Sequence, residues 1–164
     1  ILWYPGAAGD HTVKNMLRGA EVAGRALGVR LQFVEVRGPA DLDRIFTEMT
    51  KARVGALTML PSAPLSQQCN RLADLAAKNR LPALYISMRE CVTGGGLMSY
   101  GANSQDLYSR MATYVDKILK GAQAGNLPVE QPTKFELAIN LKATKALGLS
   151  IPPSVLAQAD EIIQ

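Results

Sequence analysis

The stretch from 54 to 87, VGALTMLPSAPLSQQCNRLADLAAKNRLPALYIS, decides the fold class of this chain. It opens with an apolar run from Val54 to Leu60, which Pro61 ends, and it closes with a second run from Leu81 to Ser87. Short apolar runs bounded by Gly or Pro are typical of strands buried on both faces of a parallel sheet. Apolar residues recur at helical spacing between them, at Leu65, Cys69, Leu72, Ala73 and Ala76. The stretch therefore predicts a strand-helix-strand unit whose strands run parallel.

The same alternation precedes this unit. Ile1 to Tyr4 and Leu31 to Val36 have the apolar and β-branched character of strands. A helix is predicted between them by apolar residues at Val13, Met16, Leu17, Ala20, Ala23 and Leu27. A second helix is predicted by Leu42, Ile45, Phe46 and Met49. Four strands alternating with three helices predict an α/β fold of three layers, αβα, with a parallel sheet covered by helices on both faces.

The last third of the chain departs from simple alternation. Short strands are predicted at Leu97 to Tyr100 and at Phe135 to Asn140, separated by a helix and a Gly- and Pro-containing connection over 122–133. The helix is marked by Leu107, Met111, Tyr114, Val115, Ile118 and Leu119. Final helical turns, capped by Ser154, are predicted from Val155, Leu156, Ala159, Ile162 and Ile163.

Composition limits the classes of function. The 164 residues are 48% hydrophobic and 20% charged, as in a single soluble globular domain. The net charge of +4 comes from scattered Lys and Arg residues, which gives no support to nucleic-acid binding. No apolar run reaches the length of about 18–20 residues that a membrane span needs. Because the chain starts without Met inside a predicted strand, we expect a fragment or a chain that has lost its upstream half.

Catalytic and metal-binding patterns are missing from the sequence. The only histidine is His11, and the glycines at 94–96 lie between two strands and lack the GxGxxG register, so no metal, cofactor or catalytic residue is expected. Cys69 and Cys91 have no CxxC spacing and are interpreted as two separate thiols. A disulfide would require a fold that brings their Cα atoms within ~7 Å.

The loops after the four parallel strands are the expected place for a ligand. Carboxyl ends of parallel strands meet at one edge, and open α/β sheets bind ligands beyond that edge. The loops at this rim are 5–11, 37–39, 61–64 and 87–90. Candidate ligand-binding residues on or beside them are Tyr4, Pro5, Ser62, Ala63, Glu90 and Tyr100.

Each candidate also has a plain structural role. Glu90 is expected to reach the rim, or to pair with an arginine such as Arg89. Ser62 offers a hydroxyl and loop N–H groups to a small ligand, or else caps the third helix. Tyr4 and Tyr100 present an aromatic face and a hydroxyl to a cleft, or else pack in the core.

Several long strings resemble one known family. LPALY at 81–85, GGLMSYG at 95–101, YVDKILKG at 114–121 and LPVEQPTKFEL at 127–137 are similar to the C-terminal half of ABC-transporter substrate-binding proteins of the tryptophan- or aromatic-amino-acid-binding type. The resemblance covers essentially the whole chain. It implies a type I periplasmic binding-protein fold, in which two α/β lobes close on a small ligand.

The resemblance also implies a division of the chain. Residues 1–96 and 134–164 would form the C-terminal lobe, and 97–133 would be a crossover segment belonging to the N-terminal lobe, which is largely absent. The helix over 104–120 would then expose an apolar face, a candidate surface for a homodimer. Half a cleft should bind ligand weakly or not at all.

The implied function is the extracytoplasmic, periplasmic capture of a small solute, such as an amino acid, for an ABC importer. Its partners would be the solute and the membrane permease, and the chain would not be an enzyme. Relatives often carry Asn at the position of Tyr4 and Phe at that of Cys91, so the ligand identity does not transfer. Two alternatives remain: the effector-sensing domain of a LacI-type transcription regulator, and a flavodoxin-like α/β enzyme.

Overall fold

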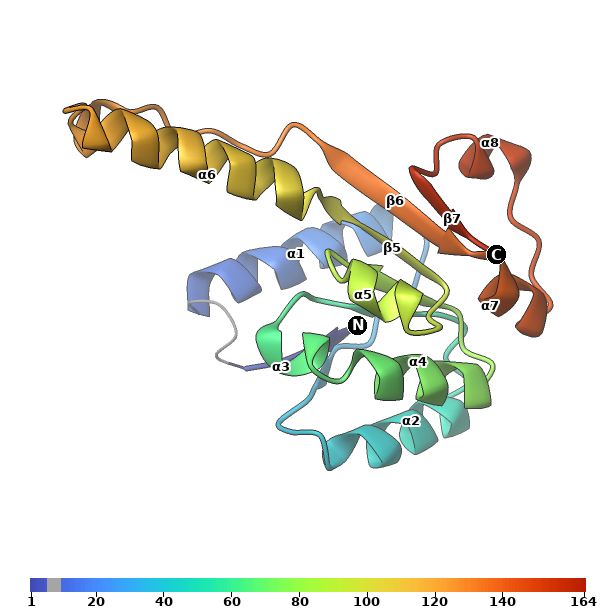
Figure 1. Cartoon of the computed structure of the whole chain (residues 1–164). Coiled ribbons are helices and arrows are strands. Elements are labelled where there is room, and N and C mark those ends of the chain that lie inside the picture. Colours follow the sequence, from blue (N-terminus) through green and yellow to red (C-terminus); the bar gives the residue numbers. More distant parts are fainter. Residues whose placement is uncertain (6–9) are drawn as a thin grey trace.

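The computed structural model describes residues 1–5 and 10–164 (Figure 1). Part of the predicted rim loop 5–11, residues 6–9, therefore lies outside the described residues. Seven strands form one sheet in the order β2-β1-β3-β4-β5-β6-β7. Their bounds are Leu2–Trp3 (β1), Val34–Glu35 (β2), Leu57–Met59 (β3), Ala83–Ile86 (β4), Met98–Ala102 (β5), Phe135–Asn140 (β6) and Glu161–Ile163 (β7).

Every neighbouring pair of strands is parallel except β5 and β6, which are antiparallel. The prediction of an α/β fold with a mostly parallel sheet is confirmed. The helices, in chain order, are Asp10–Ala26 (α1), Asp41–Lys51 (α2), Ala63–Ser66 (α3), Cys69–Lys78 (α4), Arg89–Thr93 (α5), Ser104–Leu119 (α6), Leu141–Ala146 (α7) and Pro153–Leu156 (α8), with a 3₁₀ turn at Ala124–Asn126 (η1).

Helices cover both faces of the sheet. The chain moves one way across the sheet from β1 to β2 and the opposite way from β2 to β3, so crossovers of one hand put α1 and α2 on opposite faces. Helix α4 makes the next crossover in the same direction as α2 and packs beside it. Figure 1 shows α1 on one side and α2 with α4 on the other.

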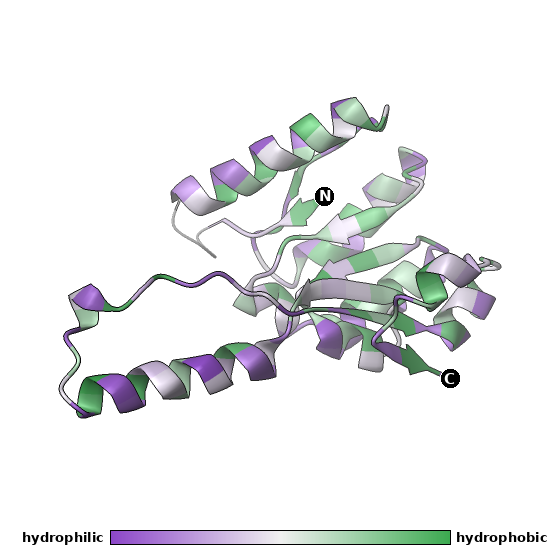
Figure 2. Ribbon diagram, turned by 90° about the horizontal axis from the view of Figure 1, so that it is seen from above, coloured by the Kyte–Doolittle hydropathy of each residue, from purple (hydrophilic) through white to green (hydrophobic). Residues whose placement is uncertain are grey.

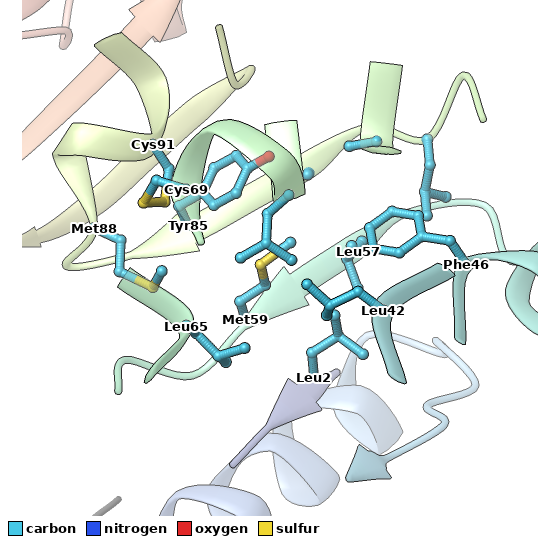
Figure 3. Close-up of a cluster of buried hydrophobic side chains, with 14 of the residues drawn as sticks. Leu2, Leu42, Phe46, Leu57, Met59, Leu65, Cys69, Tyr85, Met88 and Cys91 are labelled. Atoms are coloured by element: carbon cyan, nitrogen blue, oxygen red, sulfur yellow. A yellow bond between two sulfur atoms is a disulfide. The ribbon is translucent and has the colours of Figure 1, made fainter. Parts of the chain in front are cut away.

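The core lies on the side of α2, α4 and α5 (Figure 3). All four apolar positions predicted for the second helix are buried, and Phe46 is only 1% exposed. Tyr85 is fully buried, its hydroxyl has no hydrogen-bond partner among the described residues, and burial raises the pKa of that hydroxyl. Helix α1 packs less closely, because Met16 and Leu27 of its predicted apolar stripe remain 41% and 76% exposed.

Cys69 and Cys91 form a disulfide, so the interpretation of two separate thiols is wrong. Cys69 begins α4, Cys91 lies in α5, and the contact between these two helices brings the Cα atoms to 4.4 Å. The bond sits in the core beside Tyr85 (Figure 3). It links two residues that are 22 positions apart in the sequence and lie on different helices.

Two helix predictions also need correction. The single helix expected from Leu65 to Ala76 is divided at Gln67 and Gln68 into α3 and α4. The helical turns expected after Ser154 stop at Leu156, and the β-branched end of the chain pairs instead with β6 as strand β7. Both errors arise from sheet geometry. The first helix is divided because α3 turns the chain at the edge where the strands end. The last segment is a strand because β6 has an unpaired edge with which it can form hydrogen bonds.

Residues 103–134 form an extension that we call the arm, and the rest of the described chain is the lobe. Figures 1 and 2 show α6 and the returning segment projecting away from the sheet. Across the described stretch 100–137 no residue is buried, although Leu119, Tyr108 and Met111 are large and apolar. The arm is held together by polar contacts, including the Tyr114 hydroxyl, which donates to the Pro128 carbonyl at 2.6 Å.

Candidate functional site

A polar cavity of about 430 Å³ lies where the end of β4 meets β5 and the beginning of β6. Strands β3 and β4 are parallel neighbours, so the loops carrying Ser62 and Glu90 emerge at one edge of the sheet, and the cavity opens there. Its wall comes from the β4–α5 connection, from β5, from the first turn of α6 and from β6. The lining residues are Ser87, Arg89, Glu90, Thr93, Ser99, Gly101, Ala102, Asn103, Ser104, Gln105 and Glu136.

Strand alternation explains the floor of the cavity. Ser99 and Gly101 lie two residues apart on β5 and therefore share one face of the sheet, and Asn103 follows in the same phase. Glu136 is the antiparallel partner of Gly101, which places it on that face as well. The reversal of β6 thus brings a carboxylate to the edge at which the parallel strands end.

Ser87 closes the floor tightly against Gly101. Ser87 has a left-handed backbone conformation, with φ of 52°, and its N–H donates to the Tyr100 carbonyl at 3.0 Å. A β-carbon at Gly101 would lie 2.6 Å from the Cα of Ser87, so only glycine fits there. This close approach fixes the end of β4 over β5 and sets the position of the α5 helix that follows.

The charged groups of the cavity are unevenly partnered. Arg89 donates through Nε to Glu161 on β7 at 2.6 Å, and this hydrogen bond raises the pKa of the guanidinium. Glu136 accepts a hydrogen bond from the Asn103 amide. Glu90 is exposed, and its carboxylate has no partner among the described residues. The expected alternative, a Glu90–Arg89 pair, is not formed, because Arg89 binds Glu161.

Asn103 connects the cavity to the arm. Its side-chain oxygen accepts from the backbone N–H of Asp106 at 2.6 Å, which caps the first turn of α6, while its amide nitrogen donates to Glu136. Asparagine is a favoured residue at helix N-termini for this reason. One side chain therefore joins β6 to the beginning of α6 at the edge of the cavity.

Of the six predicted ligand-binding residues, only Glu90 lines this cavity. Ser62 is 8% exposed, and its hydroxyl accepts from the Leu65 N–H at 3.3 Å, so it caps α3. Ala63 is the exposed first residue of α3. Tyr4 and Pro5, half-buried, follow β1 at the same edge of the sheet, and Tyr4 packs against the core.

Tyr100 lies on the other face of the sheet from the cavity. It alternates with Ser99 and Gly101 on β5, and its ring stacks on Phe135 with centroids 5.8 Å apart. The tyrosine side chain is half exposed. The predicted ligand-binding residues therefore do not form one site. Glu90 lines the cavity, while Ser62 and Ala63 lie at the beginning of α3. Tyr4 and Pro5 follow β1, and Tyr100 lies on the opposite face of the sheet.

The residues that sequence reasoning missed are Ser99, Gly101, Asn103 and Glu136. The sequences of β5 and β6 contain a signal, because Glu136 is the one charged residue of β6 and Ser99 lies between Met98 and Tyr100 in β5. Their proximity depends on the antiparallel pairing of these strands, which the sequence does not specify.

A mostly parallel α/β sheet with a polar cavity at the edge where its strands end is the arrangement of a small-molecule-binding lobe. The sequence model of the family described as ABC transporter substrate binding protein matches residues 6–163. The chain therefore belongs to this family. No curated protein matches the sequence.

Three solved structures are similar to this chain. A conserved domain protein from Vibrio cholerae O1 biovar El Tor has a TM-score of 0.84 and 20% identity, with 98% of this chain and 54% of that chain covered. An ABC domain in complex with L-Trp from Streptococcus pneumoniae has a TM-score of 0.83 and 21% identity, with 99% and 56% covered. The ligand-free, open structure of a substrate-binding protein with adhesive properties from Clostridium difficile has a TM-score of 0.69 and 16% identity, with 99% and 53% covered.

These likenesses confirm the predicted periplasmic binding-protein fold. The chain spans a little over half the length of each of the three structures.

Proposed function

We propose that this chain forms a ligand-binding lobe of the extracytoplasmic substrate-binding component of an ABC importer. The observation that carries the proposal is the family match over residues 6–163, together with a polar cavity at the ligand-binding edge of the sheet. The cavity would contact one side of a small solute. Binding by this family requires no covalent step, and the described lining residues include no histidine, cysteine or lysine.

The arm supports a two-lobed receptor. We propose that 1–96 and 134–164 belong to one lobe, and that 97–133 begins with β5 in the sheet of that lobe and then passes through the arm into a second lobe. The similar structures are almost twice as long as this chain. The exposed apolar side chains of α6, such as Met111, Val115 and Leu119, would pack against that second lobe. A homodimer through the helix at 104–120 is the competing way to cover the same surface.

The mechanism we propose is closure of the two lobes around the solute. A solute that contacts both lobes binds the closed state better than the open state and so shifts the equilibrium toward closure. The closed receptor would then be the form that the membrane permease recognises. The connections between lobe and arm, at Asn103 and Lys134, are joined by a hydrogen bond from the Asn103 N–H to the Lys134 carbonyl at 3.0 Å and are the natural hinge.

The disulfide supports a location outside the cytoplasm. Stable disulfides are typical of secreted and periplasmic proteins and are rare in the reducing cytosol. Within the described part of the chain, no helix combines the length and apolar character needed to cross a membrane.

The experiment that tests this proposal is an NMR titration of the ¹⁵N-labelled chain. L-tryptophan is the first solute to use, because the Streptococcus pneumoniae structure holds it. We expect millimolar affinity, with the largest shift changes at the amides of Ser87, Ser99 and Gly101. Micromolar binding measured by calorimetry would contradict the two-lobed cleft, and shift changes confined to other surfaces would contradict the cavity.

A matched pair of variants tests whether the solute binds in the cavity. Gln105→Trp puts a bulky ring on an exposed lining residue in the first turn of α6, and we expect it to weaken the shift changes. Gln123→Trp makes the same change at the exposed far end of the arm and should leave them unchanged. Equal behaviour of the two variants would argue against solute binding in the cavity.

A further inference from the structure

Cations that are scattered along the sequence gather at one edge of the sheet. Arg30 comes shortly before β2, Arg53 before β3 and Arg80 before β4. Strands β2, β1, β3 and β4 are parallel neighbours, so these arginines lie at the edge where the strands begin, opposite the polar cavity. With neighbouring strands about 4.8 Å apart, the four strand beginnings span about 15 Å. Helices α2 and α4 end at the same edge with Lys51 and Lys78 in their last turns, and Figure 1 shows both ending on the side where α7 lies.

These five residues, which we call the basic edge, have no compensating charge. All five are exposed, and none of them forms an ion pair with another described residue. The stretches 28–33, 51–57 and 78–83 that form the edge contain no Asp or Glu. The basic edge therefore carries more positive charge than the chain as a whole, whose net charge is +4. Six other arginines do pair with carboxylates, namely Arg25, Arg37, Arg44, Arg71, Arg89 and Arg110.

Helix stability explains only part of the basic edge. Lys51 and Lys78 complement the negative ends of the α2 and α4 dipoles. Arg53 and Arg80 each follow the last residue of a helix by two positions and have a left-handed backbone, with φ of 53° and 50°. Glycine is the ordinary residue at this position, because a β-carbon makes the left-handed conformation less favourable. Two arginines in place of two glycines indicate that the charged side chains themselves have a use.

Exposed apolar side chains lie beside the cations. Leu27 is 76% exposed and Val29 is 54% exposed, directly before Arg30. Both line a cavity of about 830 Å³ at this edge, whose lining also includes Arg30 and Arg53 and no acidic residue. Cations next to exposed apolar side chains are typical of surfaces that bind membranes, where the apolar groups enter the interface and the cations meet phosphate groups. A nucleic acid or an acidic polysaccharide would pair with the cations but leave the apolar side chains in water.

We propose that the basic edge binds the surface of a membrane that contains anionic phospholipids. Its cations would contact the headgroup phosphates, and Leu27 and Val29 would enter the interface. Because the polar cavity lies at the opposite edge of the sheet, the lobe would bind a membrane and a solute at the same time. This inference goes beyond the proposed function and does not depend on which solute is bound.

Co-sedimentation with lipid vesicles tests the inference. We expect the chain to bind vesicles of phosphatidylcholine that contain about one third phosphatidylglycerol, and not to bind vesicles of phosphatidylcholine alone. Binding should weaken as the salt concentration rises, because salt screens exposed charges. Equal binding to the two kinds of vesicle, or binding to neither, would overturn the proposal.

A matched pair of double variants tests which surface binds. Arg53→Gln with Arg80→Gln removes two cations from the basic edge and should weaken vesicle binding about 30-fold, since each cation near an anionic surface contributes a factor of about five. Arg18→Gln with Lys117→Gln removes the same charge from exposed positions on α1 and α6 and should weaken it by less than about threefold. Equal weakening by the two double variants would show general attraction of a basic protein and overturn the assignment to this edge.

A second double variant separates lost charge from lost folding. Arg53→Gly with Arg80→Gly introduces the residue that suits a left-handed backbone, so the thermal unfolding temperature should stay the same or rise. Vesicle binding should fall as far as in the glutamine variant. Full binding by this glycine variant would overturn the role of the two arginines.

Leu27→Ser distinguishes a membrane from a soluble polyanion. The substitution removes an exposed apolar side chain, and we expect it to weaken vesicle binding several-fold and to leave the binding of heparin, a soluble polyanion, unchanged. Arginine-dependent binding of heparin without binding of phosphatidylglycerol vesicles would overturn the membrane assignment. The titration with L-tryptophan described above reports on solute binding alone, so the proposed function and this inference can fail separately.

Discussion

In the lobe, Phe46, Leu72 and Ile139 are almost completely buried, whereas in the arm Leu119 remains 81% exposed and Met111 59% exposed. The two regions have similar apolar side chains and different surroundings. Lobe side chains pack between sheet and helices. Arm side chains remain exposed along a helix that the returning segment of the arm contacts through polar side chains. The difference shows that the lobe has its own core, while the arm is held by polar contacts and leaves its large apolar side chains exposed.

Truncating one large apolar side chain in each region gives the widest contrast. Phe46→Ala removes a buried ring from the core, and we expect it to lower the free energy of unfolding by about 3–5 kcal/mol. Met111→Ala removes an exposed side chain from α6 and should change it by less than about 0.5 kcal/mol. Denaturant unfolding followed by circular dichroism measures both. A large loss for Met111→Ala would mean that the arm is already packed in the isolated chain.

Loss of the disulfide should weaken the lobe alone. Replacing both Cys69 and Cys91 by alanine frees α5 from α4, and we expect a cost of about 2–4 kcal/mol, since a cross-link restricts the unfolded chain. Denaturant unfolding of the double variant and of the chain treated with reductant provides the measurement. Hydrogen exchange should accelerate in α5 and remain as fast as before in α6. Equal acceleration in both helices would show that arm and lobe unfold as one unit.

Two glycine substitutions compare the regions on a smaller scale. In Gly101→Ala the new methyl group would lie 2.6 Å from the Cα of Ser87, so the backbone must move, and we expect a loss of about 1–3 kcal/mol. In Gly125→Ala, in the arm, the methyl group meets nothing within 4 Å, and the change should stay within about 0.5 kcal/mol. Thermal unfolding of both variants is the measurement. A neutral Gly101→Ala would contradict the tight β4–β5 end described above.

The sequence predicted strands β1 to β6 of the lobe better than it predicted β7, the strand at the edge of the sheet. Strands β1 to β6 were located because each has an apolar run with turn residues beside it, and for β6 the prediction matches the bounds Phe135–Asn140. Strand β7 was missed because Glu161–Ile163 has only three residues and continues an apolar spacing that also suits a helix. Its state is decided by pairing with β6, which is a tertiary effect.

The candidate site was predicted only in part, for a related reason. Glu90 was found because it directly follows a strand. Glu136 and Ser99 were not, because their contact with the cavity depends on the reversal of β6 against β5. The disulfide was missed because Cys69 and Cys91 approach through the packing of two helices, and residue spacing alone contains no record of that packing.

Low pH should destabilise the arm by protonating one carboxylate, that of Asp106. Burial opposes ionisation of Asp106, but hydrogen bonds from Lys134 and Arg110 outweigh it and hold the pKa below the usual 3.8. Nε of Arg110 lies 2.8 Å from Asp106, and Nζ of Lys134 lies 3.3 Å away, so this cluster ties α6 to the returning segment. A lowered pKa in the folded state means that the stabilisation is complete above pH 3.8 and is lost as the pH falls through the folded-state pKa.

NMR titration of the Asp106 carboxyl carbon measures this pKa, and ¹⁵N relaxation of the first turn of α6 reports the release of the arm. We expect the midpoint below 3.8 in the parent chain and a higher midpoint in Arg110→Gln, which removes one donor. The amides of β3 and β4 should keep their order over the same pH range, because their core contains no comparable ion cluster among the described residues. Exposed ion pairs such as those of Asp106 contribute little to the stability of a buried sheet. Simultaneous loss of order in β3 and in α6 would therefore contradict the view that the arm is stabilised separately from the lobe.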